Sequence, residues 1–171
     1  MYESAPWRTE LRKFAATLRN APMWPSEEVP FELERAMFYS GVVLRKLIED
    51  RKLTDSIATK KVRVATHTAT APEKSSFWRN MPGSVEFEWQ NAAFEDVTVK
   101  ELCSQIVHFF GLVWWINDDD DFCGMILCSY RQQDKKGYLI EFSAWADLLD
   151  EASDAWPSKI TWGQGAERTV E

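Results

Sequence analysis

Residues 98–149 read TVKELCSQIVHFFGLVWWINDDDDFCGMILCSYRQQDKKGYLIEFSAWADLL and hold both the most apolar and the most acidic segment of this 171-residue chain. The first four residues, Thr98-Val-Lys-Glu101, match a capping box, in which the Thr and Glu side chains satisfy backbone N–H groups at a helix start. Apolar residues then recur at helical spacing from Val99 to Ile106. The sequence therefore predicts a helix over residues 98–108 with one buried face.

Three segments after this helix are rich in aromatic and β-branched residues, which favour strands. They cover residues 109–117, 122–131 and 137–142. Because polar turns at 118–121 and 132–136 separate them, the stretch predicts a three-strand antiparallel meander. The first strand is apolar on both faces, so we expect it at the centre of the sheet and covered on both sides. A closing helix is expected over 143–156, with Ser143 as its N-cap.

The chain before this stretch alternates between the same two kinds of pattern. Apolar stripes of helical period predict helices over residues 6–20 and 27–52. Alternation of apolar and polar residues predicts strands over 61–68 and 84–90. Together with the meander of residues 109–142, this gives an α+β fold in which an antiparallel sheet of about five strands is packed by helices.

One globular domain is expected over residues 1–171, because this length suits one domain better than two. Residues 163–171 read as a loose polar tail. Hydrophobic residues make up 45% and charged residues 27% of the chain, and this composition argues against disorder.

Charge and hydropathy argue against several classes of partner. The formal net charge of −7 disfavours nonspecific binding to nucleic acid, since a basic surface supplies most of the affinity there. The longest apolar run, residues 106–116, is about half as long as a membrane-spanning helix, and the N-terminus has no signal-peptide pattern. Three sparse cysteines form no disulfide framework. We therefore expect an acidic, soluble, cytoplasmic protein that binds neither nucleic acid nor membrane.

The polar stripe of the helix over residues 98–108 is the best candidate site. Its members are Glu101, Ser104, Gln105 and His108. Their spacing of i, i+3, i+4 and i+7 projects a carboxylate, a hydroxyl, an amide and an imidazole from one face. Glu101 or His108 could act there as a general base, with Ser104 or Gln105 positioning a substrate. The alternative, which the sequence favours, is a solvated polar face of an amphipathic helix.

No metal and no cofactor is expected. His67, His108 and Cys103 lack the spacing of a zinc motif, and a structural zinc site needs three or four converging ligands. The acidic turn at residues 118–121 begins like a calcium-binding loop but lacks the Gly and the final Glu of that loop. A solvated hairpin tip is therefore its expected role, and a docking point for a basic partner is the alternative.

Nine tryptophans are many for this length. Trp24, Trp78 and Trp162 fall in predicted loops, where an exposed indole often marks a contact surface, so these are the expected binding residues. Trp114 and Trp115 point to opposite faces of one strand, and one of them could line a ligand pocket. Predicted inner faces hold the other four, which are Trp7, Trp89, Trp145 and Trp156.

Two segments resemble a family of small uncharacterised bacterial proteins. They are residues 34–49, ERAMFYSGVVLRKLIE, and residues 101–108, ELCSQIVH, which together cover under a fifth of the chain. The resemblance implies a bacterial, cytoplasmic protein. It implies no activity, cofactor or catalytic residue, and it makes residues 101–108 the first place to search for a site.

The function that the sequence favours is that of a non-catalytic binding or accessory protein. It would act through protein–protein contacts with a partner or with a second copy of itself. The net charge, the loop tryptophans and the absence of a catalytic motif support this interpretation. Two alternatives stay open: a small hydrolase or nuclease-like enzyme that uses His108 and Glu101, and a small-ligand-binding protein with a Trp-lined pocket.

Overall fold

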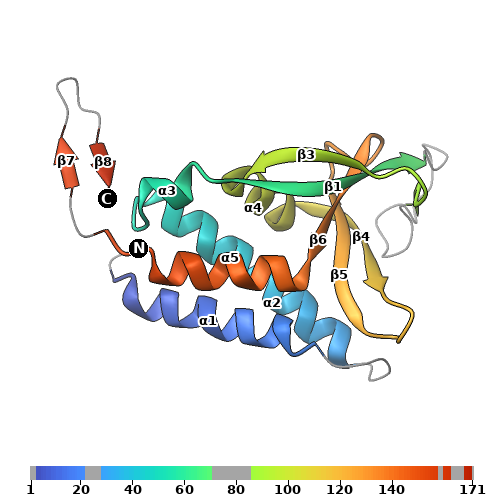
Figure 1. Ribbon diagram of the computed structural model, residues 1–171, viewed down its shortest axis with the longest axis horizontal. Coiled ribbons are helices and arrows are strands. Elements are labelled where there is room, and N and C mark those ends of the chain that lie inside the picture. The colour runs from blue at the N-terminus through green and yellow to red at the C-terminus, as the bar shows by residue number, and fades with distance from the viewer. Residues whose placement is uncertain (1–2, 22–27, 71–85, 158–159, 163–167, 171) are drawn as a thin grey trace.

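The structure, a computed structural model, describes residues 3–21, 28–70, 86–157, 160–162 and 168–170 (Figure 1). The helices of these residues are α1 (Ala5–Arg19), α2 (Glu28–Glu49), α3 (Asp55–Ala58), α4 (Val99–Val107) and α5 (Phe142–Asp154). The strands are β1 (Lys61–Thr70), β2 (Glu86–Phe87), β3 (Ala93–Thr98), β4 (Phe109–Ile116), β5 (Phe122–Ser129), β6 (Lys136–Glu141), β7 (Ile160–Trp162) and β8 (Arg168–Val170). The predicted α+β class is confirmed.

The main sheet is a curled antiparallel sheet of six strands in the order β2-β1-β6-β5-β4, with β3 also paired to β1. The predicted meander is its second half, since β4 pairs with β5 and β5 pairs with β6. β2 and β3 follow one another along the same edge of β1, with Phe87 opposite Ala69 and Ala93 opposite Thr66. Between these two pairs, residues 88–92 of the edge lie opposite residues 67–68 of β1. Five residues therefore face two, and the edge carries an extended bulge.

Helices α1, α2 and α5 pack together on one side of the sheet (Figure 1). Their buried side chains form the main core with the sheet, where Trp145 of α5 donates from Nε1 to Ser40 Oγ of α2 at 2.9 Å. A smaller cluster covers the other face of the sheet. The alternation along β5 separates the two, because Met125 and Leu127 belong to the main core and Ile126 and Cys128 to the smaller cluster.

Strand β4 lies at an edge of the described sheet, so its predicted central position is wrong. Among the described residues it pairs with β5 alone. Its two apolar faces are explained by the two clusters. Leu112 and Trp114 pack on the main core, while Phe110 and Val113 pack on the smaller cluster.

The predicted strand over 84–90 is wrong in extent, and β3 was not predicted at all. Only Glu86–Phe87 is strand within the described part of that segment. The sequence did not predict β3 because Val97 is its one buried residue and Phe94 is 61% exposed. An edge strand with so little buried surface shows no apolar alternation.

Helix boundaries agree with the sequence to within a few residues. α5 begins at Phe142 with Glu141 as N-cap, so the predicted cap Ser143 lies inside the first turn. Strand β8 pairs with β7 in the segment predicted to be a loose tail. None of the helices in the described part of the chain has both the length and the apolar composition needed to cross a membrane.

Three of the tryptophans assigned to inner faces are about half exposed. Only Trp145 is buried, whereas Trp7, Trp89 and Trp156 are 42%, 50% and 51% exposed. Trp156 lies under the guanidinium of Arg8, which is 4.4 Å from the indole centre. A tryptophan ring that packs on the core with one side and contacts a charged group with the other lies at the edge of the core rather than inside it.

Gly41 lets α2 and α4 approach closely. A Cβ at residue 41 would lie 2.7 Å from Cγ2 of Ile106, so a larger side chain must displace the Ile106 side chain or α4 itself. Arg45 lies one turn further along α2 and His108 lies just beyond Ile106. The Gly41–Ile106 contact therefore also sets the spacing between Arg45 and His108.

Replacing Gly41 by Leu is expected to destabilise the protein by about 1–3 kcal/mol, because an overpacked helix contact forces side chains and backbone apart. Urea denaturation followed by circular dichroism measures this change. The double variant Gly41→Leu/Ile106→Ala should be more stable than the sum of the two single effects, since Ile106→Ala removes the contacted atoms. A neutral Gly41→Leu would show that α2 and α4 do not meet closely.

The three cysteines should differ in reactivity. Burial raises the pKa of the Cys103 thiol to about 12 and that of the Cys128 thiol to about 11, while Cys123 is half-buried. Because the thiolate is the reactive form, a disulfide reagent at pH 8 should modify Cys123 in the native protein and all three thiols only after unfolding. Cys123→Ser should abolish the native reaction. Fast native modification of Cys103 would contradict its placement in the core.

Candidate functional site

Helix α4 presents the polar stripe that the sequence singled out. β3 ends at Thr98 and α4 begins at the next residue, with Thr98 Oγ1 accepting a hydrogen bond from the Glu101 N–H at 3.1 Å. Thr98 is thus the N-cap that the sequence predicted. The opposite stripe of α4, which includes Leu102, Cys103 and Ile106, is buried in the main core.

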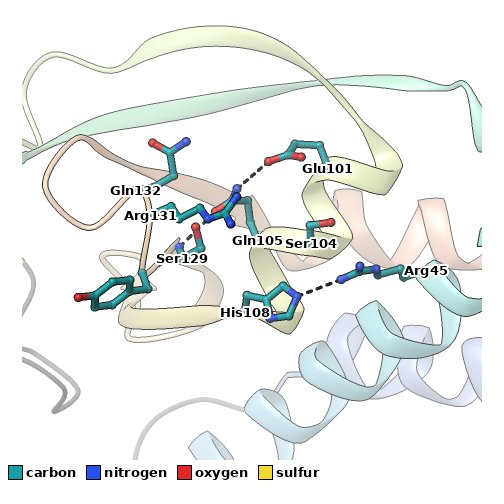
Figure 2. Close-up of a pocket in the computed structure, with 9 residues that line it drawn as sticks. Arg45, Glu101, Ser104, Gln105, His108, Ser129, Arg131 and Gln132 are labelled. Atoms are coloured by element: carbon teal, nitrogen blue, oxygen red, sulfur yellow. Dashed lines mark hydrogen bonds between the residues drawn. The ribbon is translucent and has the colours of Figure 1, made fainter.

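The polar stripe lines a cavity of about 600 Å³. Three parts of the chain surround it: α2, α4, and the end of β5 with the turn that follows. The lining residues are Arg45, Glu101, Ser104, Gln105, His108, Ser129, Tyr130, Arg131 and Gln132. Figure 2 shows Arg45 reaching this region from α2 on one side and Arg131 from beyond β5 on the other. All four predicted site residues therefore lie in one concave region.

Gln105 ties α4 to β5. Its side chain is almost fully buried, its Nε2 donates to Glu101 Oε1 at 2.7 Å, and its Oε1 accepts from the Ser129 N–H at 3.2 Å. Both ends of the amide are thus satisfied within the protein. Gln105 shapes the cavity wall, and Glu101 is oriented by it.

His108 is held by Arg45 of α2. Nη1 of Arg45 lies 3.1 Å from Nε2 of His108, and Nε of Arg45 donates to Glu49 Oε1 at 2.9 Å. A guanidinium can only donate, so Nε2 of His108 accepts in this arrangement and the ring proton is on Nδ1. The hydrogen bond from Arg45 also holds the pKa of Glu49 below its ordinary value.

The groups needed for acid–base chemistry are engaged with protein atoms. Nε2 of His108 is occupied by Arg45, and one carboxylate oxygen of Glu101 by Gln105. The Ser104 hydroxyl donates to the Lys100 carbonyl at 3.0 Å rather than to the imidazole. In this arrangement the stripe offers neither a nucleophile paired with a base nor an unoccupied imidazole nitrogen on Nε2.

Arg131 is the unengaged cation of the cavity. Its side chain is exposed and has no hydrogen-bond or ion-pair partner among the residues that the structure describes. Arg45 and Arg131 bring two guanidinium groups to a cavity whose lining includes one carboxylate, that of Glu101. Guanidinium groups bind carboxylate and phosphate oxygens in a bidentate manner. The cavity is therefore suited to a small anion.

Metal-binding groups do not gather in the described residues, where no three His, Cys, Asp or Glu side chains are placed to hold an ion. His67 lies in β1, with Nδ1 3.1 Å from the Glu88 carbonyl oxygen and the Trp89 ring 5.6 Å away. The acidic turn is the tip of the β4–β5 hairpin. Asn117 Oδ1 accepts from the backbone N–H of Asp119 and Asp121 at 3.0 and 2.8 Å.

The side chains of the three tryptophans predicted to bind fall outside what the structure describes. Trp24 and Trp78 lie outside the described residues, and the side chain of Trp162 on β7 does as well. Trp114 packs edge-on against Phe122 and Phe142, with ring centres 5.3 and 6.4 Å away, and Trp115 is half-buried.

Sequence reasoning did not find Arg45, Ser129, Arg131 and Gln132 as lining residues. Arg45 lies four residues before Glu49, a spacing that predicts only an ion pair on one helix face, and Arg131 was the last residue of a predicted strand. Their position in one cavity with α4 depends on contacts between segments far apart in the chain. No local pattern encodes such contacts.

Comparisons of the chain with protein-family models, with curated proteins and with solved structures give no match.

Removing the Gln105 amide should cost stability, because it leaves the buried Ser129 N–H without its acceptor. Gln105→Leu is expected to destabilise the protein by roughly 1–3 kcal/mol, the cost of an unsatisfied buried donor. Ser104→Ala on the same helix face is the matched control and should change stability little. Equal effects of the two substitutions in urea denaturation would contradict the role of Gln105.

Proposed function

We propose that the protein is a non-catalytic binding protein whose α4 cavity takes a small molecule with a carboxylate or phosphate group. The observation that carries this proposal is the pair of guanidinium groups, Arg45 and Arg131, which line one cavity from separate elements. The protein as a whole is acidic, with a net charge of −7. A paired cationic lining is therefore a local feature and not a reflection of the composition.

Arg45 and Arg131 would play different parts. Arg45 is already oriented by Glu49 and by His108, so its remaining donors are preorganised and lose little side-chain entropy when a ligand binds. Arg131 has no competing partner among the described residues and would close on the anion from the other side.

The rest of the lining favours a ligand that also carries hydroxyl groups. Glu101 keeps one carboxylate oxygen free of Gln105, and a bare anion beside it would be repelled. A ligand hydroxyl can donate to that oxygen, while the hydroxyls of Ser104 and Ser129 line the same cavity. Hydroxy acids and phosphorylated polyols combine these two kinds of group.

A catalytic use of the same side chains is the second candidate. It is favoured by one observation, that His108 and Glu101 line one cavity. It requires Arg45 to release Nε2 of His108 before the imidazole can act as a base. Binding requires no such rearrangement, and for this reason it is preferred.

Titration calorimetry with citrate, with glycerol phosphate and with neutral glycerol tests the proposal and separates carboxylate from phosphate recognition. At least one of the two anions should bind and glycerol should not. Arg131→Gln should weaken binding about tenfold to a hundredfold, the value of a charged hydrogen bond, without lowering the melting temperature.

Lys135→Gln is the matched control, because it removes the same charge from the same β5–β6 connection outside the cavity lining. An equal loss of affinity in Lys135→Gln would show that Arg131→Gln acts through the overall charge of the protein and not through contact with the ligand. Absence of binding by both anions would overturn the proposal. Turnover of a bound ester that is lost in His108→Ala would favour the catalytic candidate.

A further inference from the structure

A second surface, separate from the α4 cavity, lies along the first half of α2. It is a groove of about 310 Å³ lined by Phe31, Glu34, Arg35, Phe38, Tyr39 and Phe109. None of these residues lines the α4 cavity. Phe31 is 63% exposed and Tyr39 is 50% exposed, which is unusual for two large rings on one helix face.

The aromatic rings of this groove form a connected set. Phe38 meets Tyr39 and Phe109 edge-on, with ring centres 5.6 and 6.4 Å apart, and Tyr39 stacks on Phe14 of α1 at 6.5 Å. The groove is thus anchored to three elements, α1, α2 and β4. A rigid aromatic surface of this kind is typical of protein contact sites, because its rings lose little entropy on binding.

Charges in the groove follow a pattern that suits a copy of the same helix. Phe31 and Phe38 are seven residues apart and lie near the centre of the exposed face. Glu34 and Arg35 lie between them and flank this centre on opposite sides, at about −50° and +50° for 100° per residue. The face therefore carries an acid on one flank and a base on the other.

We propose that this surface pairs with α2 of a second copy of the chain about a two-fold axis parallel to the helix. Such an axis brings each phenylalanine toward its own equivalent and exchanges the two flanks. Glu34 then lies beside the partner's Arg35, and the reverse contact forms as well. Antiparallel pairing would instead place like charges on the same flank, so the charge pattern selects the parallel arrangement.

Charge complementarity favours a second copy of the chain over an unrelated helix as the occupant of the groove. The groove carries an acid on one flank and a base on the other, so two copies related by the two-fold axis complement each other. The pairing region also leaves the α4 cavity untouched, because Arg45 lies further along α2. The inference therefore goes beyond the proposed function and does not depend on it.

Charge reversal in sedimentation velocity experiments tests the pairing. The wild-type protein should show a reversible dimer. Glu34→Arg alone and Arg35→Glu alone should each weaken dimerisation at least about tenfold, because two like-charged pairs replace two opposite pairs in each dimer. The double variant Glu34→Arg/Arg35→Glu should dimerise again, and so should an equimolar mixture of the two single variants.

Lys13→Glu is the matched control. Like Arg35→Glu it reverses an exposed cation and breaks an i,i+3 pair with a glutamate, since Lys13 pairs with Glu10 as Arg35 pairs with Glu32, both at 2.7 Å. It should leave the dimer intact, and circular dichroism should show that all variants are folded. A monomeric wild-type protein would overturn the proposal. A dimer insensitive to the single reversals, or single variants that fail to pair when mixed, would do the same.

Discussion

Helix α4 has no linker at either end, and this constraint fixes the candidate site. β3 ends at Thr98, α4 begins at Val99, and only His108 separates the helix from β4. The rotation of the helix about its axis is therefore set by two strands of the main sheet. The Gln105 bridge to the Ser129 N–H then locks its polar face against the end of β5. A cavity built on such a face is preorganised, which lowers the entropy cost of holding a ligand.

The same constraint supports the proposal that the polar stripe binds a ligand rather than performs acid–base chemistry. A helix that cannot rotate keeps His108 at its C-terminal end, where Arg45 of α2 meets it. The distance between the two helices is in turn set by Gly41 against Ile106. With Nε2 occupied by a donor that cannot accept a proton, the imidazole serves to orient Arg45. Arg131, the cation of the cavity lining that has no partner among the described residues, lies outside the helix.

Local sequence signals predicted the parts of the fold that depend on local physics. The N-cap at Thr98, the helical stripe of α4 and the strands of the meander were predicted correctly, because caps and periodicity act within a few residues. The Glu101 side chain of the predicted capping box instead accepts a hydrogen bond from Gln105 Nε2. The sequence did not predict strand β3 or the edge position of β4, because both depend on pairing with strands that no local pattern specifies. The candidate site divides in the same way. The α4 stripe was found, whereas Arg45 and Arg131 reach it only through the tertiary fold.

Helix α2 connects the α4 cavity with the aromatic groove. Its first half carries Phe31 and Phe38, its middle contacts α4 at Gly41, and its last part carries Arg45. One helix of 22 residues thus touches both the proposed dimer contact and the α4 cavity proposed to bind an anion. Coupling between two sites requires an element whose position both of them bias. α2 meets the geometric part of that requirement. The tight Gly41–Ile106 contact would transmit a shift of α2 to α4 and so to the distance between Arg45 and the polar stripe.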